Sequence, residues 1–372
     1  TELSKFHSIS VVARHSSFAF AGEKLTIPEV ARRLRANYVV EGSVRRSGTR
    51  LRLIAQLIEA ESGKHLWAEH FDQETEAIFD IEDRIVSRIA GMLESSLLQE
   101  ELSNSKRAIP TGAKPYDLWL QARKLMEAWS PEEDRKAEEL LQRAVALDPD
   151  FARGHAGLAG IYNTRILLLP GIGNAAEFLE QGFLHARRAV ELDPNDARNH
   201  IDLAWSFMLA GKVRQGEKHF DLALKLNPND ASILTACSLG KAFLGDPAEG
   251  ELLAERAMEL NPLFPDYYLG NLAFIQFIGE NYEAALETIE RAPKALPELS
   301  AWRAAALAQL GRVNEAREAA EELRRSIGAI WAGDGPMTDG ALVDWLLSIN
   351  AFADPGDRQR LFGGLQKSGL DV

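Results

Sequence analysis

The sequence predicts a mainly α-helical protein, an α-solenoid in which helix pairs stack into a right-handed superhelix, preceded by a small α+β domain. Three observations predict this class: a proline-terminated phrase that recurs about every 34 residues, an alternating apolar pattern near the start, and a length of 372 residues that exceeds one compact core. We expect the α+β domain over 1–105, a linker over 106–115, about six repeats over 116–326, and a helical cap or tail over 327–372.

The recurring phrase reads RAVALDPD, RAVELDPN, LALKLNPN, RAMELNPL and, in degraded form, ERAPKALPE. Its prolines, spaced by 45, 34, 34 and 35 residues, are Pro149, Pro194, Pro228, Pro262 and Pro297. Each helix is expected to end there, because proline lacks a backbone donor and disfavours α geometry in the residue before it. Asp150, Asp196 and Asp230 are placed to cap the helices that follow. The longer first interval holds eleven extra residues around the segment ILLLPGIGN.

Small and large apolar residues recur with the same period as the prolines. In the repeat that starts at Ala197, Ala204 lies where two helices approach most closely, Gly211 falls in the turn, Phe220 is a core wedge and Ala223 lies at the helix crossing. This pattern resembles that of the tetratricopeptide-repeat (TPR) family, and the resemblance covers all six expected repeats. It implies a superhelix whose inner groove is lined by the first helix of each pair and holds an extended or helical peptide.

The family frame places ten residues on the groove side. They are Arg153, Asn163, Arg198, Ile201, Trp205, Met208, Thr235, Leu239, Leu269 and Gln276. Helical periodicity fits ordinary core packing of Trp205 and Met208 equally well, because it does not say which face is covered. A subset of the family binds chaperone tails through a lysine and asparagine carboxylate clamp. Ala156, Gly160, Ile201 and Trp205 stand at the equivalent positions here, so we do not expect that class of partner.

The first part of the chain changes period. We expect a strand over 9–14, a helix over 26–36, three strands between 38 and 71 joined by turns at Ser47-Gly48 and Ser62-Gly63, and an amphipathic helix over 76–98. Together these elements predict a helix packed on an antiparallel sheet.

A turn at Ser47-Gly48 would place Val44 opposite Leu51 on the covered face of the sheet and Arg45 opposite Arg50 on the outer face, beside Arg52. Opposed like charges are mildly destabilising. The three arginines are therefore either screened by solvent or a patch for an anionic partner, and screening is the simpler interpretation because exposed pairs contribute little.

The runs VVARHSSFAFAGEK and VARRLRANYVVEGSVRRSGTRLRLIAQLIEAESGKHLWAEHFD resemble the TolB-amino-terminal-like domain of bacterial multidomain proteins, over about residues 1–100. The ending FADPGDRQRLFGGLQKSGL is similar to the tail that follows the TPRs of those proteins. The resemblance implies an effector domain upstream, most often a class III adenylate/guanylate cyclase and sometimes a winged-helix DNA-binding domain. The chain begins at Thr1 and lacks the opening strand and helix of that domain, so we expect a fragment of a longer protein.

Composition narrows the classes of partner. The net charge is −13, with +6 in residues 1–56 (ten Lys/Arg, four Asp/Glu) and −19 in the remainder (32 against 51). A chain this acidic is not expected to bind nucleic acid or a membrane surface, since both are polyanions. It has one cysteine, Cys237, and no run of about 20 apolar residues that could span a bilayer. We therefore expect a cytoplasmic location, with an envelope location of the parent protein left open.

Catalytic patterns are weak throughout. His65 and His70 lie near acids but point to opposite faces of a strand, which disfavours a shared metal. PGIGNAAE lacks the Gly-Lys-Ser/Thr ending of a phosphate loop, so we interpret it as a loop with Asn174 as helix cap. We expect no cofactor and no catalytic site. The sequence thus predicts a non-catalytic interaction scaffold, the regulatory region of a bacterial signalling protein; the alternatives are the C-terminal part of a nucleotide cyclase or of a winged-helix regulator.

Overall fold

The computed structural model describes Val12 and residues 26–34, 36–47, 50–60, 62–74, 114–126, 130–261 and 264–372. The chain divides into two compact units, Thr1–Glu100 and Glu101–Val372, and each is considered by itself. Apart from Val12, the strand expected over 9–14 lies outside the described residues, as do the helix expected over 76–98 and most of the linker expected over 106–115.

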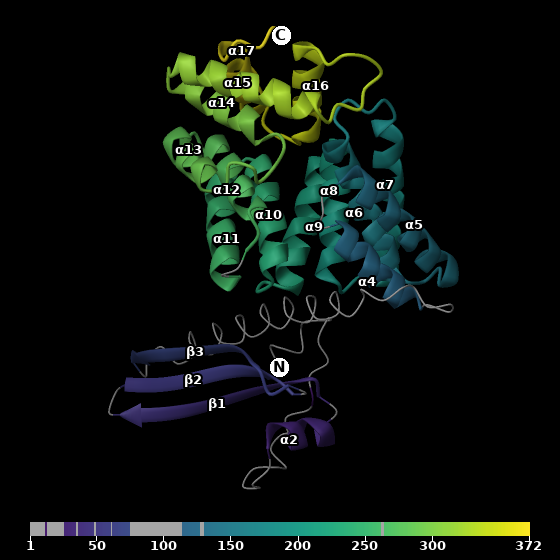
Figure 1. Ribbon diagram of the computed structural model, residues 1–372, viewed down its shortest axis with the longest axis vertical. Coiled ribbons are helices and arrows are strands. Elements are labelled where there is room, and N and C mark those ends of the chain that lie inside the picture. Colours follow the sequence, from purple (N-terminus) through teal and green to yellow (C-terminus); the bar gives the residue numbers. More distant parts are fainter. Residues whose placement is uncertain are drawn as a thin grey trace. The chain divides into compact units, whose positions relative to one another are not determined.

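In the first unit, helix α2 (Ile27–Leu34) precedes a three-stranded antiparallel sheet of β1 (Tyr38–Ser47), β2 (Arg50–Glu59) and β3 (His65–Glu74), in the order β1-β2-β3 (Figure 1). Thr26 begins the helix, and its backbone N–H and hydroxyl donate to Glu29 over 2.8 and 2.7 Å. On one face of the sheet Ala55, Leu57 and Trp67 are buried. The expected helix and three strands are confirmed.

The hairpin register differs from the expected one by two residues. Strand pairing runs to Ser47 and Arg50, so Val44 lies opposite Leu53 and Arg45 lies opposite Arg52. The sequence prediction placed the turn one residue too early along the chain. Because the shift is even, every residue keeps its predicted face of the sheet.

The described part of the second unit consists of twelve helices in six pairs, followed by two further helices (Figure 1). The pairs are α4 (Pro115–Met126) with α5 (Pro131–Leu147), α6 (Ala152–Leu168) with α7 (Ala175–Leu192), α8 (Ala197–Leu209) with α9 (Val213–Leu226), α10 (Ala231–Phe243) with α11 (Pro247–Leu260), α12 (Tyr267–Ile278) with α13 (Tyr282–Arg291), and α14 (Leu299–Gln309) with α15 (Val313–Gly328). The last two helices are α16 (Asp339–Ile349) and α17 (Pro355–Lys367). The predicted fold class is confirmed.

Caps and turns explain most of the helix ends. The carboxylate of Asp196 accepts from the backbone N–H of Arg198, and that of Asp230 accepts from Ser232, as expected of helix caps. Asp150 does not cap α6, whose N-cap is Phe151; its carboxylate instead accepts from Arg188 over 2.6 Å. Gly211 lies in the turn between α8 and α9 with φ of +70°, a conformation that favours glycine.

Small residues fill the contacts between helices. Ala204, Ala223 and Cys237 are fully buried, and so is the large side chain of Phe220 that packs in the same core cluster. This close packing leaves no room for larger side chains: a Cβ on Gly240 would lie 2.5 Å from the ring of Phe220. The small and aromatic residues that recur with the repeat period are therefore the residues that pack in the core.

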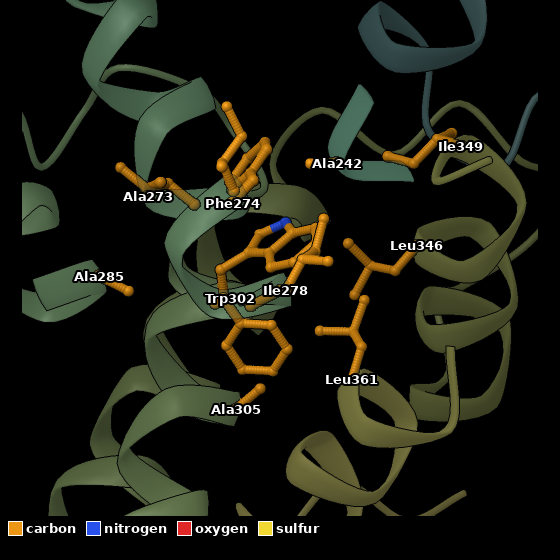
Figure 2. Packing of buried hydrophobic residues seen from close by; sticks show 14 of the residues in the cluster. Ala242, Ala273, Phe274, Ile278, Ala285, Trp302, Ala305, Leu346, Ile349 and Leu361 are labelled. Carbon is orange, nitrogen blue, oxygen red and sulfur yellow. The ribbon is translucent and has the colours of Figure 1, made fainter. Parts of the chain in front are cut away.

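The C-terminal segment after α15 closes part of the array. On α16, six apolar side chains are buried: Leu342, Val343, Trp345, Leu346, Leu347 and Ile349. They join a core cluster that includes residues of α6, α8, α10, α12 and α14. In Figure 2, Leu346 of α16 and Leu361 of α17 point toward the indole of Trp302 on α14. Helices α16 and α17 thus contribute to the core of the second unit.

Three hydrogen bonds tie this segment to distant repeats. The indole Nε1–H of Trp345 donates to the carbonyl of Ile166 over 2.8 Å, across 179 residues of sequence. The N–H of Ala332 donates to the carbonyl of Pro170, also over 2.8 Å. The N–H of Ala353 donates to the carbonyl of Phe243 over the same distance. The extra residues around ILLLPGIGN, which interrupted the repeat period, therefore form a docking point of the C-terminal segment.

Candidate partner-binding surface

The residues expected to line the groove divide into two groups. Six are buried inside the array, and only four keep part of their surface exposed. The buried ones are Asn163, Ile201, Met208, Thr235, Leu269 and Gln276. The partly exposed ones are Arg153, Arg198, Trp205 and Leu239.

Contacts within the fold account for the buried polar members. The amide of Asn163 donates to the hydroxyl of Ser206 over 2.8 Å and to the backbone carbonyl of Asp202 over 3.2 Å, which ties α6 to α8. Gln276 donates to Glu251 over 3.0 Å and accepts from Thr288 over 2.8 Å. These side chains join neighbouring helices and do not face solvent.

Core packing accounts for the buried apolar members. A Cβ on Gly216 of α9 would come within 2.8 Å of Met208, so Met208 fills the space between the two helices of its pair. The sequence allowed either groove lining or core packing for Met208, and in the structure Met208 is a core residue. Trp205 also packs its ring edge to face on Phe220, at 5.4 Å between centroids, while remaining partly exposed.

The two arginines are held in place by neighbours. The guanidinium of Arg153 lies over the rings of Trp119 and Tyr116, at 5.2 and 5.8 Å from their centroids. Arg198 forms an ion pair with Asp230, the cap of α10, at 3.2 Å. Both are positioned at the first turn of their helix, where the inner face begins.

A solvent-accessible part of the inner face remains on the first helices of the second to fourth pairs. We call it the inner strip. It consists of partly or fully exposed residues on one side of α6, α8 and α10: Arg153, Ala156, Gly160, Thr164, Arg198, Asp202, Trp205, Ser232, Ala236 and Leu239. Three residues of the strip, Trp205, Ala236 and Leu239, pack against the core cluster to which α16 belongs. This part of the strip therefore borders the core.

Asp202 is the inner-strip residue that sequence reasoning missed. Its residue surface is partly exposed, yet protein surrounds the carboxylate, and this burial, with Asp196 as a further negative charge, raises the pKa of Asp202 to about 8. Arg198 opposes the shift only in part. The available signal was an acid four residues after Arg198, one helical turn further along the same side of the helix.

Two histidine pairs occupy equivalent places in the second and third pairs of helices. His155 and His185 approach within 2.9 Å between their Nδ1 atoms, and His200 and His219 do the same. The Nε2 atoms of His155 and His200 lie 3.1 and 2.9 Å from the carbonyls of Pro149 and Pro194, respectively, to which they donate. Burial and the neighbouring imidazole lower the pKa of His185 to about 4, and the same causes lower the pKa of His219.

The register places all three arginines of the patch on one face of the sheet. Arg45 and Arg52 are exposed and lie opposite each other, and Arg50 lies opposite Ser47, two residues before Arg52 on the same strand. Strand β3 places Asp72 opposite Arg52. The patch remains a prediction.

Metal clusters and membrane-spanning helices are absent from the described part of the chain. It contains no group of three or more His, Cys, Asp and Glu side chains arranged to hold a metal ion. His65 Nδ1 instead lies 3.1 Å from the side-chain oxygen of Gln56. Within the described ranges, no helix is both long and apolar enough to cross a membrane.

Six stacked helix pairs with small residues at their crossings define the helical unit as a TPR-type α-solenoid. No family model matches the sequence. A Rhizobium meliloti (strain 1021) protein named "Putative adenylate cyclase 3" is 36% identical over 159 residues, which is 43% of this chain and 27% of that protein. The chain thus matches about a quarter of the length of this curated relative.

Solved structures with similar folds include a thermophilic TPR protein of Thermus thermophilus, with 20% identity, a TM-score of 0.40, and coverage of 55% of this chain and 98% of that one. PilF of Pseudomonas aeruginosa has 14% identity and a TM-score of 0.40, covering 57% and 90%. A TPR protein of Parabacteroides merdae ATCC 43184 has 15% identity and a TM-score of 0.39, covering 69% and 94%. At these values the likenesses carry no functional argument.

Proposed function

We propose that this chain is a non-catalytic scaffold that binds another polypeptide along the inner strip. The observation that supports the proposal is a row of first helices whose inner side is still accessible on α6, α8 and α10, between aromatic and charged side chains, while the rest of that side is packed. A peptide in such a row contacts several repeats at once, which suits an extended or helical segment.

The scaffold is proposed to act as the regulatory region of a longer bacterial signalling protein in the cytoplasm. The partial match to a protein named as an adenylate cyclase supports this parent, and the first unit is proposed to be a TolB-amino-terminal-like domain next to the effector. The effector would be a class III cyclase; a winged-helix domain is the second candidate, suggested by the resemblance alone. Genomic sequence upstream of the codon for Thr1 tests this: a cyclase domain encoded there in the same reading frame would support the first candidate, and a winged-helix domain the second.

Selection of peptides tests the scaffold proposal. The intact chain would be used to select binders from a random peptide-display library. Ala236→Gln, which enlarges a partly exposed inner-strip residue, should weaken the selected peptides about tenfold or more by occupying their space. Leu252→Gln is the matched control, since Leu252 is 68% exposed on α11, the second helix of its pair, and should leave binding unchanged.

Three results would contradict the scaffold proposal. Failure to select any peptide, or equal loss of binding in the two variants, would contradict binding along the inner strip. Incubation of the chain with ATP or GTP and a divalent metal should yield no cyclic nucleotide; turnover would contradict the non-catalytic assignment.

A further inference from the structure

Two pairs of histidines join the first and second helices of neighbouring repeats in the same way. We call His155 of α6 with His185 of α7 the first histidine pair, and His200 of α8 with His219 of α9 the second. In each pair the Nδ1 atoms are 2.9 Å apart. The ring centroids lie 5.1 and 5.2 Å apart, with interplanar angles of 32° and 20°. The contact is therefore a repeated feature of the fold.

The backbone determines which ring nitrogens carry hydrogen at neutral pH. Each pair has one buried ring, and its Nε2 atom lies 3.1 Å (His155) or 2.9 Å (His200) from the carbonyl of the proline six residues earlier. A carbonyl only accepts, so this Nε2 carries a proton, and the Nδ1 atom of the neutral ring is left as an acceptor. The half-buried ring on the second helix then donates its Nδ1–H. One proton thus lies between the two rings.

The contact has room for no second proton between the rings. A first added proton goes to Nε2 of the half-buried ring, which keeps its Nδ1–H and still donates. A second added proton finds only the accepting Nδ1 of the buried ring. Two N–H groups would then face each other at 2.9 Å, each on a positively charged imidazole. A doubly protonated pair must therefore move apart.

Other charged groups around the first histidine pair have partners of their own. The ring of Tyr162 on α6 is 5.9 Å from that of His185, and its hydroxyl donates to Glu138 of α5 over 2.7 Å. On α7, Arg188 forms an ion pair with Asp150 at 2.6 Å. Burial, and after it the charge of the other imidazole, lowers the pKa of His185 to about 4.

The second histidine pair has comparable surroundings. The ring of Phe207 on α8 stacks on that of His219 at 5.5 Å, and Lys212, the N-cap of α9, lies over an aromatic ring of α7. From α10, Lys241 forms an ion pair with Asp221, two residues after His219, at 2.9 Å. Burial and the other imidazole lower the pKa of His219. Among the described residues no carboxylate is hydrogen-bonded to any of the four imidazoles, so a second charge on a pair is not compensated.

The next repeat shows that the fold does not require polar side chains at this place. Leu234 of α10 and Leu253 of α11 stand 34 residues after His200 and His219, and they pack in one apolar cluster. Two leucines thus join the helices of that pair where two imidazoles join the helices of the preceding ones. The imidazoles add what leucines lack, a contact that depends on protonation.

We propose that the two histidine pairs are acid-sensitive joints of the array: protonation of both rings separates α6 from α7 and α8 from α9, while the leucine-joined repeat stays closed. The fold favours the neutral rings, so the joints are closed above the ordinary imidazole pKa of about 6.5 and open as pH falls toward 4. The joints lie at the first turns of α6 and α8, which also carry Arg153 and Arg198 of the inner strip. Opening therefore changes the inner face, whatever that face binds.

Hydrogen exchange of the intact chain at about pH 7.5 and about pH 4.5, corrected for the intrinsic effect of pH on exchange, tests the joints. Residues 152–160, 180–190, 197–207 and 214–223 should lose protection at the lower pH on the order of tenfold relative to residues 231–260. A factor of ten corresponds to a difference of one pKa unit, which allows for the partial exposure of the rings on the second helices.

Variants taken from the chain's own next repeat separate the joints from other effects of acid. His155→Leu with His185→Leu gives the first pair two leucines, and His200→Leu with His219→Leu does the same for the second. Each double variant should lose the acid response in its own two helices and keep it in the other two. His70→Leu, at an exposed position of strand β3, is the control and should leave both responses unchanged.

An acid response that persists in the helices of a leucine variant, or that is missing from the unaltered chain, would overturn the proposal. Nitrogen-15 NMR of the imidazoles is a second measurement that needs no variant. Near neutral pH each pair should show one ring with Nδ1–H and one with Nε2–H, and the two rings should change together on acidification. Four rings that titrate independently near pH of about 6.5 would likewise overturn the joints.

Discussion

Replacing Trp345 by phenylalanine should weaken the closure of the array by removing one hydrogen bond. The carbonyl of Ile166 would in a continuing helix accept from the backbone N–H four residues later, but that residue is Pro170, which has none. The indole of Trp345 supplies the missing donor at 2.8 Å, in a buried place. Leaving a buried carbonyl without a donor costs about 1–3 kcal/mol of unfolding free energy.

The matched control is Trp302→Phe in the same core cluster. Trp302 is 1% exposed, and its Nε1–H has no partner among the described residues. Both changes shrink an indole to a phenyl ring, so both leave a cavity, but only Trp345→Phe also removes a hydrogen bond. Trp345→Phe should therefore be the more destabilising of the two, by about 1–3 kcal/mol.

Urea unfolding of the full chain followed by circular dichroism measures the two losses. Hydrogen exchange locates them, since Trp345→Phe should speed exchange in residues 165–173 and 330–353 ahead of the other repeats. A larger loss for Trp302→Phe, or exchange that rises evenly over the array, would refute the closing role of this hydrogen bond.

Three further predictions concern other parts of the second unit. The lowered pKa values of His185 and His219 mean that the fold favours neutral imidazoles. Their contribution to the free energy of unfolding is therefore complete above pH of about 6.5 and is lost as pH falls toward 4. Between pH 7.5 and 5, unfolding free energy should drop by about 1–2 kcal/mol more in the unaltered chain than in His185→Phe, a value reduced for partial exposure; equal pH dependence in urea midpoints would contradict this. Arg165→Met should cost about 3–5 kcal/mol, because Asp134 is left buried without the guanidinium 2.6 Å away, and Asp134→Leu on that background should restore much of the loss; a thermal midpoint unchanged by Arg165→Met alone would count against the buried pair. Gly171→Ala should cost about 1–3 kcal/mol, since φ is +80° and the new Cβ would meet the ring of Trp331 at 2.4 Å; Gly211→Ala, with φ of +70° but open space, should cost about 1 kcal/mol, and equal costs would show that Trp331 does not pack there.

The sequence predicted the repeats because their signals are local. Proline after an Ala-rich helix, glycine in the turn and small residues at the crossings each act within one helix pair. The cap at Asp150 was predicted wrongly because the chain turns one residue later, at Phe151. The hairpin register was predicted wrongly because the turn was placed one residue too early, and each residue by which a turn moves along the chain shifts the pairing by two.

The closure by the C-terminal segment could not be predicted in the same way. Trp345 and Ile166 are 179 residues apart, and no pattern near either residue points to the other. One indirect signal existed: YYLGNLAFIQFI, which forms α12, is apolar around almost its whole circumference, as is typical of a helix covered on all sides. For the same reason Leu269 and Gln276 proved to be buried.

Asp202 illustrates the corresponding limit for the candidate site. Its raised pKa depends on burial by the surrounding protein and on the charge of Asp196, and neither effect could be foreseen when the groove residues were assigned from the repeat frame. Such an environment is a property of packing between repeats, and the frame of a single repeat does not contain it.

An engineered disulfide tests the closed array most directly. A Cβ on Gly173 would lie 3.9 Å from the side-chain oxygen Oδ2 of Asp334, and both residues are exposed, so cysteines at the two positions should be able to join after a small movement of the backbone, while the native Cys237 is buried. Mild oxidation of the Gly173→Cys, Asp334→Cys chain should give an intramolecular disulfide in nearly all molecules, seen by mass and by faster migration without reductant. Two free thiols under the same conditions, in a chain that remains folded, would contradict the docking of the C-terminal segment on the second helix pair.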